Sequence, residues 1–174
     1  MAAGWRTAFQ TVGVSLLIWF GVGMAHASVD IVFGKVTSVA DGDTVTVVAE
    51  DGQRIKVRLL AIDAPELKQP FGPPARDALK KLVQDKEVKL VITKLDRYDR
   101  SLAKLLLNGQ DVNLMLVTNG MAWHYRQYEG DQSQEDRLAY ARAEVGARRD
   151  NLGLWSQAKP LAPWFFRRGI GSAR

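Results

Sequence analysis

The chain has 174 residues, enough for one domain with a sizeable core, and its 24 basic and 19 acidic residues give a net charge of +5. It contains no cysteine, which excludes disulfides, zinc–thiolate sites and thiol catalysis. Its only histidines are His26 and His124, which argues against histidine-ligated zinc and serine-histidine triads. Any chemistry therefore depends mainly on carboxylates, arginines, lysines or tyrosines, and the mild positive charge is compatible with a polyanionic partner.

The first 27 residues are typical of a secretory signal peptide. Arg6 supplies positive charge, residues 9–23 carry no charge, and Ala25-His26-Ala27 has the small-x-small form of a cleavage site. The uncharged run is short for a membrane span, which needs about 20 residues. We therefore expect an exported protein, periplasmic or secreted, without stable membrane association after cleavage. A retained membrane anchor is the alternative.

The first half of the mature chain predicts a β-meander. Alternating, β-branched residues indicate strands over 31–40 and 44–49. An Asp-Gly hairpin signal at 50–53 leads into a third strand over 54–62. These three strands would pair in antiparallel order.

The second half alternates between helices and strands. Gly72-Pro73-Pro74 opens a helix that runs to about Val83, and further strands are predicted over 88–95 and 102–107. Two more helices are predicted over 112–119 and 134–149. This order indicates an α+β domain, and a five-stranded OB-fold β-barrel with three helices fits it.

We place this domain at residues 28–157 and expect it to be a monomer. Residues 158–174 form a C-terminal tail without helical or strand periodicity. Docking of its aromatic residues on the domain, disorder and contact with a polyanion are all compatible with its composition.

Carboxylates gather at one end of the meander. Strands one and three run in the same direction, so the DGDT link and the end of the third strand lie at the same sheet edge. This brings Asp41, Asp43, Asp63 and Glu66 into one neighbourhood. Such carboxylates repel one another unless a cation or arginines compensate, and oxygen ligands without histidine favour calcium or magnesium. Ordinary turn chemistry is the alternative for the Asp-Gly-Asp link.

Arg58 lies within an apolar strand, which is costly unless its guanidinium meets an anion. That anion is either a neighbouring aspartate or a bound phosphate. Because five residues of straight strand span about 16 Å, Arg58 and Asp63 can serve one site only if the chain bends sharply between them.

Several motifs occur in one order along residues 36–156: DGDT (41–44), RLLAIDAPE (58–66), FGPPA (71–75), DRYDR (96–100) and GLWS (153–156). Together they resemble the staphylococcal nuclease family, the thermonucleases. The resemblance implies a five-stranded barrel of the oligonucleotide-binding type with three helices. It also implies calcium-dependent (Ca2+) endonuclease cleavage of DNA, RNA or both.

The resemblance also implies a calcium site. Asp43 and Asp63 are similar to the family's calcium carboxylates. Ala64 occupies a position whose backbone carbonyl binds the ion, so alanine is compatible where the family often has threonine. Asp41 resembles an acid that holds a water molecule of the cation, and Glu66 resembles the candidate general base.

The phosphate-binding residues follow from the same resemblance. Arg58 and Arg100 are similar to the arginines that grip the scissile phosphate, and Arg97 and Tyr98 fall where the family contacts another phosphate of the substrate. Asp99 departs from the usual glycine at a turn that needs a positive φ, and aspartate is among the few other residues that adopt it at modest cost.

Two other functions remain open from the sequence. One is a non-catalytic nucleic-acid-binding OB module of the same family, and the other is a phosphate or nucleotide binder without turnover. Degenerate domains of this family typically lack the carboxylates or the arginines, whereas both sets are present here.

Overall fold

The structure, a computed structural model, describes Met1 and residues 30–169. Nearly all of the expected signal peptide therefore lies outside the described residues. Among the helices that are described, none is both long and apolar enough to cross a membrane.

Five long strands close into a barrel: β1 (Asp30–Val39), β2 (Thr44–Ala49), β3 (Arg54–Leu59), β5 (Glu87–Leu95) and β6 (Ser101–Leu107). Their order is β3-β2-β1-β5-β6, and parallel pairing of β3 with β6 joins the two edges. The expected five-stranded OB-fold barrel is confirmed. Shorter strands extend or flank it: β4 (Ile62–Asp63), β7 (Gln110–Asp111) and β8 (Trp123–His124).

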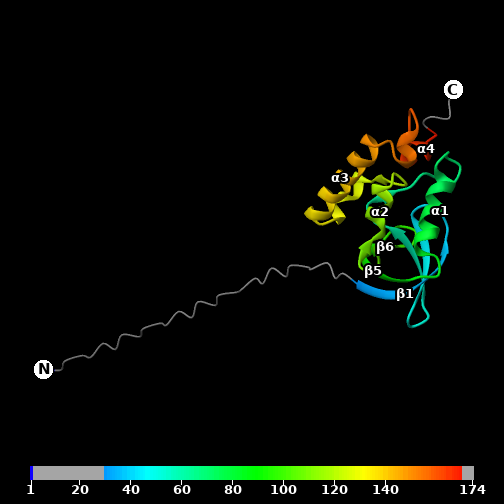
Figure 1. Ribbon diagram of the computed structural model, residues 1–174. Helices are drawn as coiled ribbons and strands as arrows, with labels where there is room; N and C mark the ends of the chain where they lie inside the picture. The colour runs from blue at the N-terminus through cyan, green and yellow to red at the C-terminus, as the bar shows by residue number, and fades with distance from the viewer. Residues whose placement is uncertain (2–29, 170–174) are drawn as a thin grey trace.

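The three expected helices are present as α1 (Gly72–Val83), α2 (Val112–Thr118) and α3 (Gln134–Arg149). In Figure 1 they gather above the barrel, and α2 packs against both β6 and α3. Two 3-10 helices follow α2 and α3, namely η1 (Arg126–Asp131) and η2 (Gly153–Ser156).

Side-chain alternation explains why these strands enclose a core. Ile55, Val57 and Leu59 of β3 are buried, whereas Arg54 and Lys56, which alternate with them, are exposed. The same period of two buries the inward residues of the other strands, because successive side chains point to opposite faces of a sheet. Removal of this apolar surface from water is the main stabilising contribution to the barrel.

The third strand differs from its prediction. It was expected over 54–62 but ends at Leu59, and Ala61 adopts a left-handed φ of 62°. Side chains with a Cβ rarely adopt this conformation, so surrounding contacts must stabilise it. The side-chain amide of Asn113 donates to the carbonyl of Leu60 (3.1 Å) and so satisfies a backbone acceptor at the bend. The chain then continues as β4, which pairs with β8.

The C-terminal tail packs against the domain. Ala162 and Pro163 are buried, and the side-chain amide of Gln69 donates to the carbonyl of Leu161 (2.8 Å). The tail includes the short helix α4 (Pro163–Phe166), drawn in red in Figure 1 at the end of the molecule away from β1. Its contacts thus continue beyond residue 157, where the sequence suggested that the domain ends.

Candidate active site

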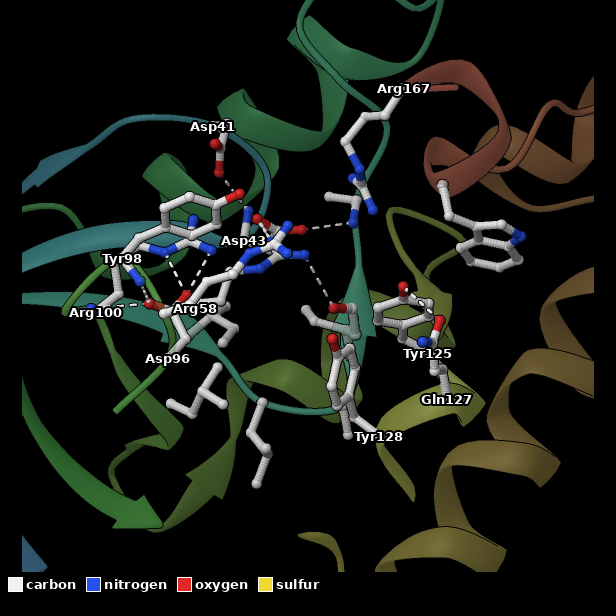
Figure 2. A pocket seen from close by; sticks show the side chains of 18 of the residues that line it. Asp41, Asp43, Arg58, Asp96, Tyr98, Arg100, Tyr125, Gln127, Tyr128 and Arg167 are labelled. Carbon is white, nitrogen blue, oxygen red and sulfur yellow. Dashed lines mark hydrogen bonds and ion pairs between the residues drawn. The ribbon is translucent and has the colours of Figure 1, made fainter. Parts of the chain in front are cut away.

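A pocket of about 730 Å³ opens where the DGDT turn, the β3–β4 bend, the β5–β6 turn and the C-terminal tail meet (Figure 2). Every residue whose role was inferred from the resemblance lines it except Asp63, which is fully buried. The charged side chains that line it are Asp41, Asp43, Arg58, Glu66, Lys94, Asp96, Arg97, Arg100, Arg167 and Arg168.

The DGDT turn is stabilised by its own side chains and by a glycine. Asp41 accepts a hydrogen bond from the backbone N–H of Asp43 at 3.1 Å, which is the turn chemistry considered above. A Cβ on Gly42 would lie 2.6 Å from the Cβ of Ala64 and 2.8 Å from that of Ala75. Only glycine therefore lets this turn pack against both segments, and the turn carries Asp43 to the pocket wall.

Arg58 bridges the two buried carboxylates. Its guanidinium forms an ion pair with Asp43 and donates to Asp63 at 2.7 Å. The side chains of Asp43 and Asp63 are only 5% and 1% exposed, so their charges need such a partner. The sharp bend that the shared site requires is thus present, and it brings all three groups together.

Burial lowers the pKa of the Arg58 guanidinium. Its pKa is lowered because burial disfavours the charged form, and the neighbouring charges of Asp63 and Asp41 offset part of this effect. The guanidinium nevertheless remains charged at neutral pH, since free arginine titrates far above it.

Ala64 and Glu66 follow directly after β4. The N–H of Ala64 donates to Asp43 at 2.7 Å and thereby orients this carboxylate. The N–H of Glu66 donates to the side chain of Gln69 at 2.8 Å, which holds the backbone of the segment. The carboxylate of Glu66 is left partly exposed at the pocket.

Arg100 is oriented by Asp96 at the other side of the pocket (Figure 2). Its Nε donates to Asp96 at 2.7 Å, and Asp96 also accepts from the N–H groups of Tyr98 and Arg100. Burial alone would raise the pKa of Asp96, but these bonds from Arg100 and Tyr98 hold it below the usual value.

The turn between β5 and β6 has the geometry expected for Asp99, the residue that replaces the family's usual glycine. Asp99 adopts a φ of 58° and is exposed, which confirms the positive φ inferred for this position. Arg97 and Tyr98 are exposed at the pocket mouth, and the Tyr98 ring lies 4.8 Å from the Arg97 guanidinium and 5.4 Å from that of Arg100. Such stacking orients arginines without using their hydrogen-bond donors.

The pocket residues that were not anticipated from the sequence include Tyr125, Tyr128, Trp164 and Arg167. The rings of Tyr125 and Trp164 stack with centroids 5.2 Å apart. Arg167 donates to Asp63 at 2.8 Å and to Glu66 at 2.7 Å. The aromatic and basic composition of WFFRR (164–168) was the available signal, but composition alone does not indicate where a tail docks.

The donor set fits a hard cation. Asp43 and Asp63 supply buried oxygen ligands, and they already share one positive charge, the Arg58 guanidinium. Within residues 30–169, no three or more histidine, cysteine or acidic side chains form a group that could hold a metal. The two buried carboxylates are oxygen donors, the ligand type of hard cations.

Known proteins resemble this chain along most of its described length. The family described as "Staphylococcal nuclease homologue" matches residues 56–157. An "Uncharacterized endonuclease" of Haemophilus influenzae is 40% identical over 134 residues, which cover 77% of this chain and 72% of that protein. A "Micrococcal nuclease" of Shigella flexneri is 39% identical over 149 residues, covering 80% and 83%.

A plant relative is larger. The "Probable staphylococcal-like nuclease CAN2" of Oryza sativa subsp. japonica is 34% identical over 140 residues, which cover 80% of this chain but only 35% of the rice protein. The bacterial relatives are similar over most of their own length. On these grounds the chain belongs to the staphylococcal nuclease family.

Proposed function

We propose that this protein is a calcium-dependent phosphodiesterase that acts as an endonuclease on DNA, RNA or both. The observation that carries the proposal is the convergence of Asp43, Arg58, Glu66 and Arg100 around one open pocket, with the buried Asp63 paired to Arg58. The names of the relatives support cleavage of nucleic acid. The use of calcium by this family in general supports the choice of cation.

The arginines account for phosphate recognition. A phosphodiester resists attack because its anionic oxygens repel a nucleophile, and further negative charge accumulates in the transition state. Guanidiniums offer paired donors that match phosphate oxygens. Arg58 reaches the pocket from β3 and Arg100 from the β5–β6 turn, and Asp96 keeps Arg100 oriented before substrate arrives. Groups oriented in advance stabilise developing charge without further reorganisation.

Glu66 is the proposed general base. Its carboxylate is exposed enough to hold a water molecule. It takes a proton from this water as the water oxygen attacks phosphorus, and one P–O ester bond breaks. The departing oxygen takes up a proton from solvent. Asp43 and Asp63 would hold calcium, which would supply a further positive charge that polarises the phosphate.

A digestion experiment tests this function. Plasmid DNA and a structured RNA are incubated with the purified protein in calcium and in excess chelator. We expect cleavage of at least one substrate in calcium and its loss in chelator. Strong cleavage in chelator would contradict the calcium requirement, and tight binding without cleavage would favour the non-catalytic module.

Export of the protein is also a proposal, and it rests on the pattern of the first 27 residues. N-terminal sequencing of protein isolated from the periplasm or the medium should begin at Ser28. Recovery of an uncleaved amino terminus in the membrane fraction would favour a retained anchor. A size-exclusion measurement checks the expected monomer.

A further inference from the structure

We propose that Arg167, from the C-terminal tail, is a functional residue of the active site. It is a tethered competitor of calcium that sets the calcium concentration at which the site is filled. This inference rests on the proposed function. The functional unit would accordingly extend past residue 157 into the tail.

Arg167 occupies the same carboxylate oxygens that a cation would use. Its Nη1 donates to Oδ1 of Asp63 at 3.1 Å, and its Nη2 donates to Oδ2 of the same residue at 2.8 Å. Nη1 also donates to Glu66 at 2.7 Å. One guanidinium therefore contacts both the proposed calcium ligand and the proposed base, and in Figure 2 it enters the pocket from the C-terminal segment.

The charges at this point favour the arrangement. The two guanidiniums of Arg58 and Arg167 offset two of the three negative charges of Asp43, Asp63 and Glu66. Hydrogen bonds to Asp63 raise the pKa of Arg167, burial opposes this, and the bond to Glu66 adds to it. Without Arg167, the three carboxylates would carry a larger net negative charge and attract a divalent cation more strongly.

Arg167 is better placed to move than Arg58. Its side chain is 42% exposed, whereas that of Arg58 is 14% exposed and contacts the carbonyl of Ile62 from within the barrel wall. Arg167 directly follows the short helix α4 and lies outside the barrel, so rotation of its side chain leaves the barrel unchanged. A cation can thus take its place without disturbing the β3–β4 bend.

Aromatic contacts keep the competitor near the site. Trp164 stacks on Tyr125 at 5.2 Å and contacts Trp123 edge-on at 5.3 Å. Ala162 is buried at the start of α4. A guanidinium tethered in this way has a high effective concentration at Asp63, so it competes with calcium although each contact is exchangeable.

Isothermal titration of calcium chloride into the full mature protein, without nucleic acid, tests the inference. We expect Arg167→Ala to lower the calcium Kd about tenfold, within the range of ordinary coupling between two ligands. Arg167→Lys keeps the charge but not the paired donors, and should lie between the alanine variant and the wild type. The calcium concentration for half-maximal DNA cleavage should fall in the same ratio as the Kd.

Arg168→Ala is the matched control. Arg168 is an exposed neighbour with the same charge, and no ion pair to it is found among residues 30–169. Its removal should change the calcium Kd by less than about twofold, because an exposed charge is screened by solvent. Circular dichroism and thermal unfolding establish that each variant is folded.

The outcomes separate this inference from the proposed function. If the wild type binds calcium and cleaves DNA, but Arg167→Ala binds calcium equally well or more weakly, the inference is overturned and the function stands. An equal gain in Arg168→Ala would also overturn it, since net charge alone would explain the effect. If the wild type binds no calcium at all, both are overturned.

Discussion

Arg58 donates to Asp63 over 2.7 Å although a straight strand would hold residues five positions apart at about 16 Å. The left-handed backbone at Ala61 turns the chain between them, and the two side chains meet at the pocket wall. This bend converts a strand of the barrel into a segment that presents a guanidinium and a carboxylate to the same point.

Arg58→Ala and Arg100→Ala should each lower kcat by about 100-fold or more, the scale for removal of one contact to transition-state charge. Single-turnover cleavage of a defined oligonucleotide measures the effect. Arg54→Ala is the control, because Arg54 lies exposed on the same strand as Arg58 and its substitution removes the same charge. Near-wild-type turnover in either pocket variant would remove that arginine from the proposed mechanism.

Glu66→Gln should lower kcat while leaving the calcium Kd nearly intact. The amide keeps the size of the carboxylate and can still accept a hydrogen bond from Arg167, but it cannot take a proton from water. Turnover and calcium titration on the same preparation provide the comparison. Unchanged turnover would mean that Glu66 is not the general base and has only a structural role.

Asp63→Ala should abolish calcium binding and also destabilise the fold. Its carboxylate is fully buried and contacts both Arg58 and Arg167, so its removal leaves two guanidiniums short of a partner. We expect a loss of about 2 kcal/mol or more in the free energy of unfolding, as for other broken buried pairs. Chemical denaturation measures it, with the exposed Asp51→Ala as control. Full stability would mean that the guanidiniums find other partners.

Asp96→Asn should produce a pH-dependent loss of stability. The pKa of Asp96 is lowered in the folded state, so its ion pair with Arg100 stabilises the protein above the unfolded value of about 4. This contribution disappears as the pH falls through the lowered folded value. The stability gap between wild type and variant should therefore be present at pH 7, about 1 kcal/mol, and should close at acid pH. A gap independent of pH would assign the effect to the backbone contacts instead.

Asp99→Gly should lower the Michaelis constant modestly at low ionic strength. Asp99 is exposed and places a negative charge beside the phosphate-binding arginines, an effect of a fraction of a kcal/mol that salt screens. Glycine adopts the positive φ without strain. KM at low and high salt decides the question, and equal values at low salt would mean that Asp99 serves only the turn geometry.

The secondary structure could be predicted because its signals are local. Ile55 and Val57 alternate with polar residues, and such a period of two is visible within a few positions. Gly72 and its following prolines likewise begin α1 where they were expected to. Family motifs added the residues of the site, and all of them except the buried Asp63 line one pocket.

Partners of the charged side chains could not be predicted, because they depend on contacts between distant segments. Arg100 pairs with Asp96 rather than with the adjacent Asp99, since the turn directs Asp99 to solvent. Ala61 has no side-chain signal for a left-handed conformation, which its surroundings impose.

Arg167 is the clearest case, since it lies 104 positions from Asp63 in the chain and yet contacts both of its oxygens. The composition of the C-terminal segment identified a tail with aromatic and basic residues, but nothing in the local sequence specified where they would bind. Packing of Trp164 on Tyr125 decides that position. Local sequence thus determined the strands, the helices and the available chemical groups. Only long-range packing decided which charges meet, because apolar burial and charge pairing act between segments that the sequence keeps far apart.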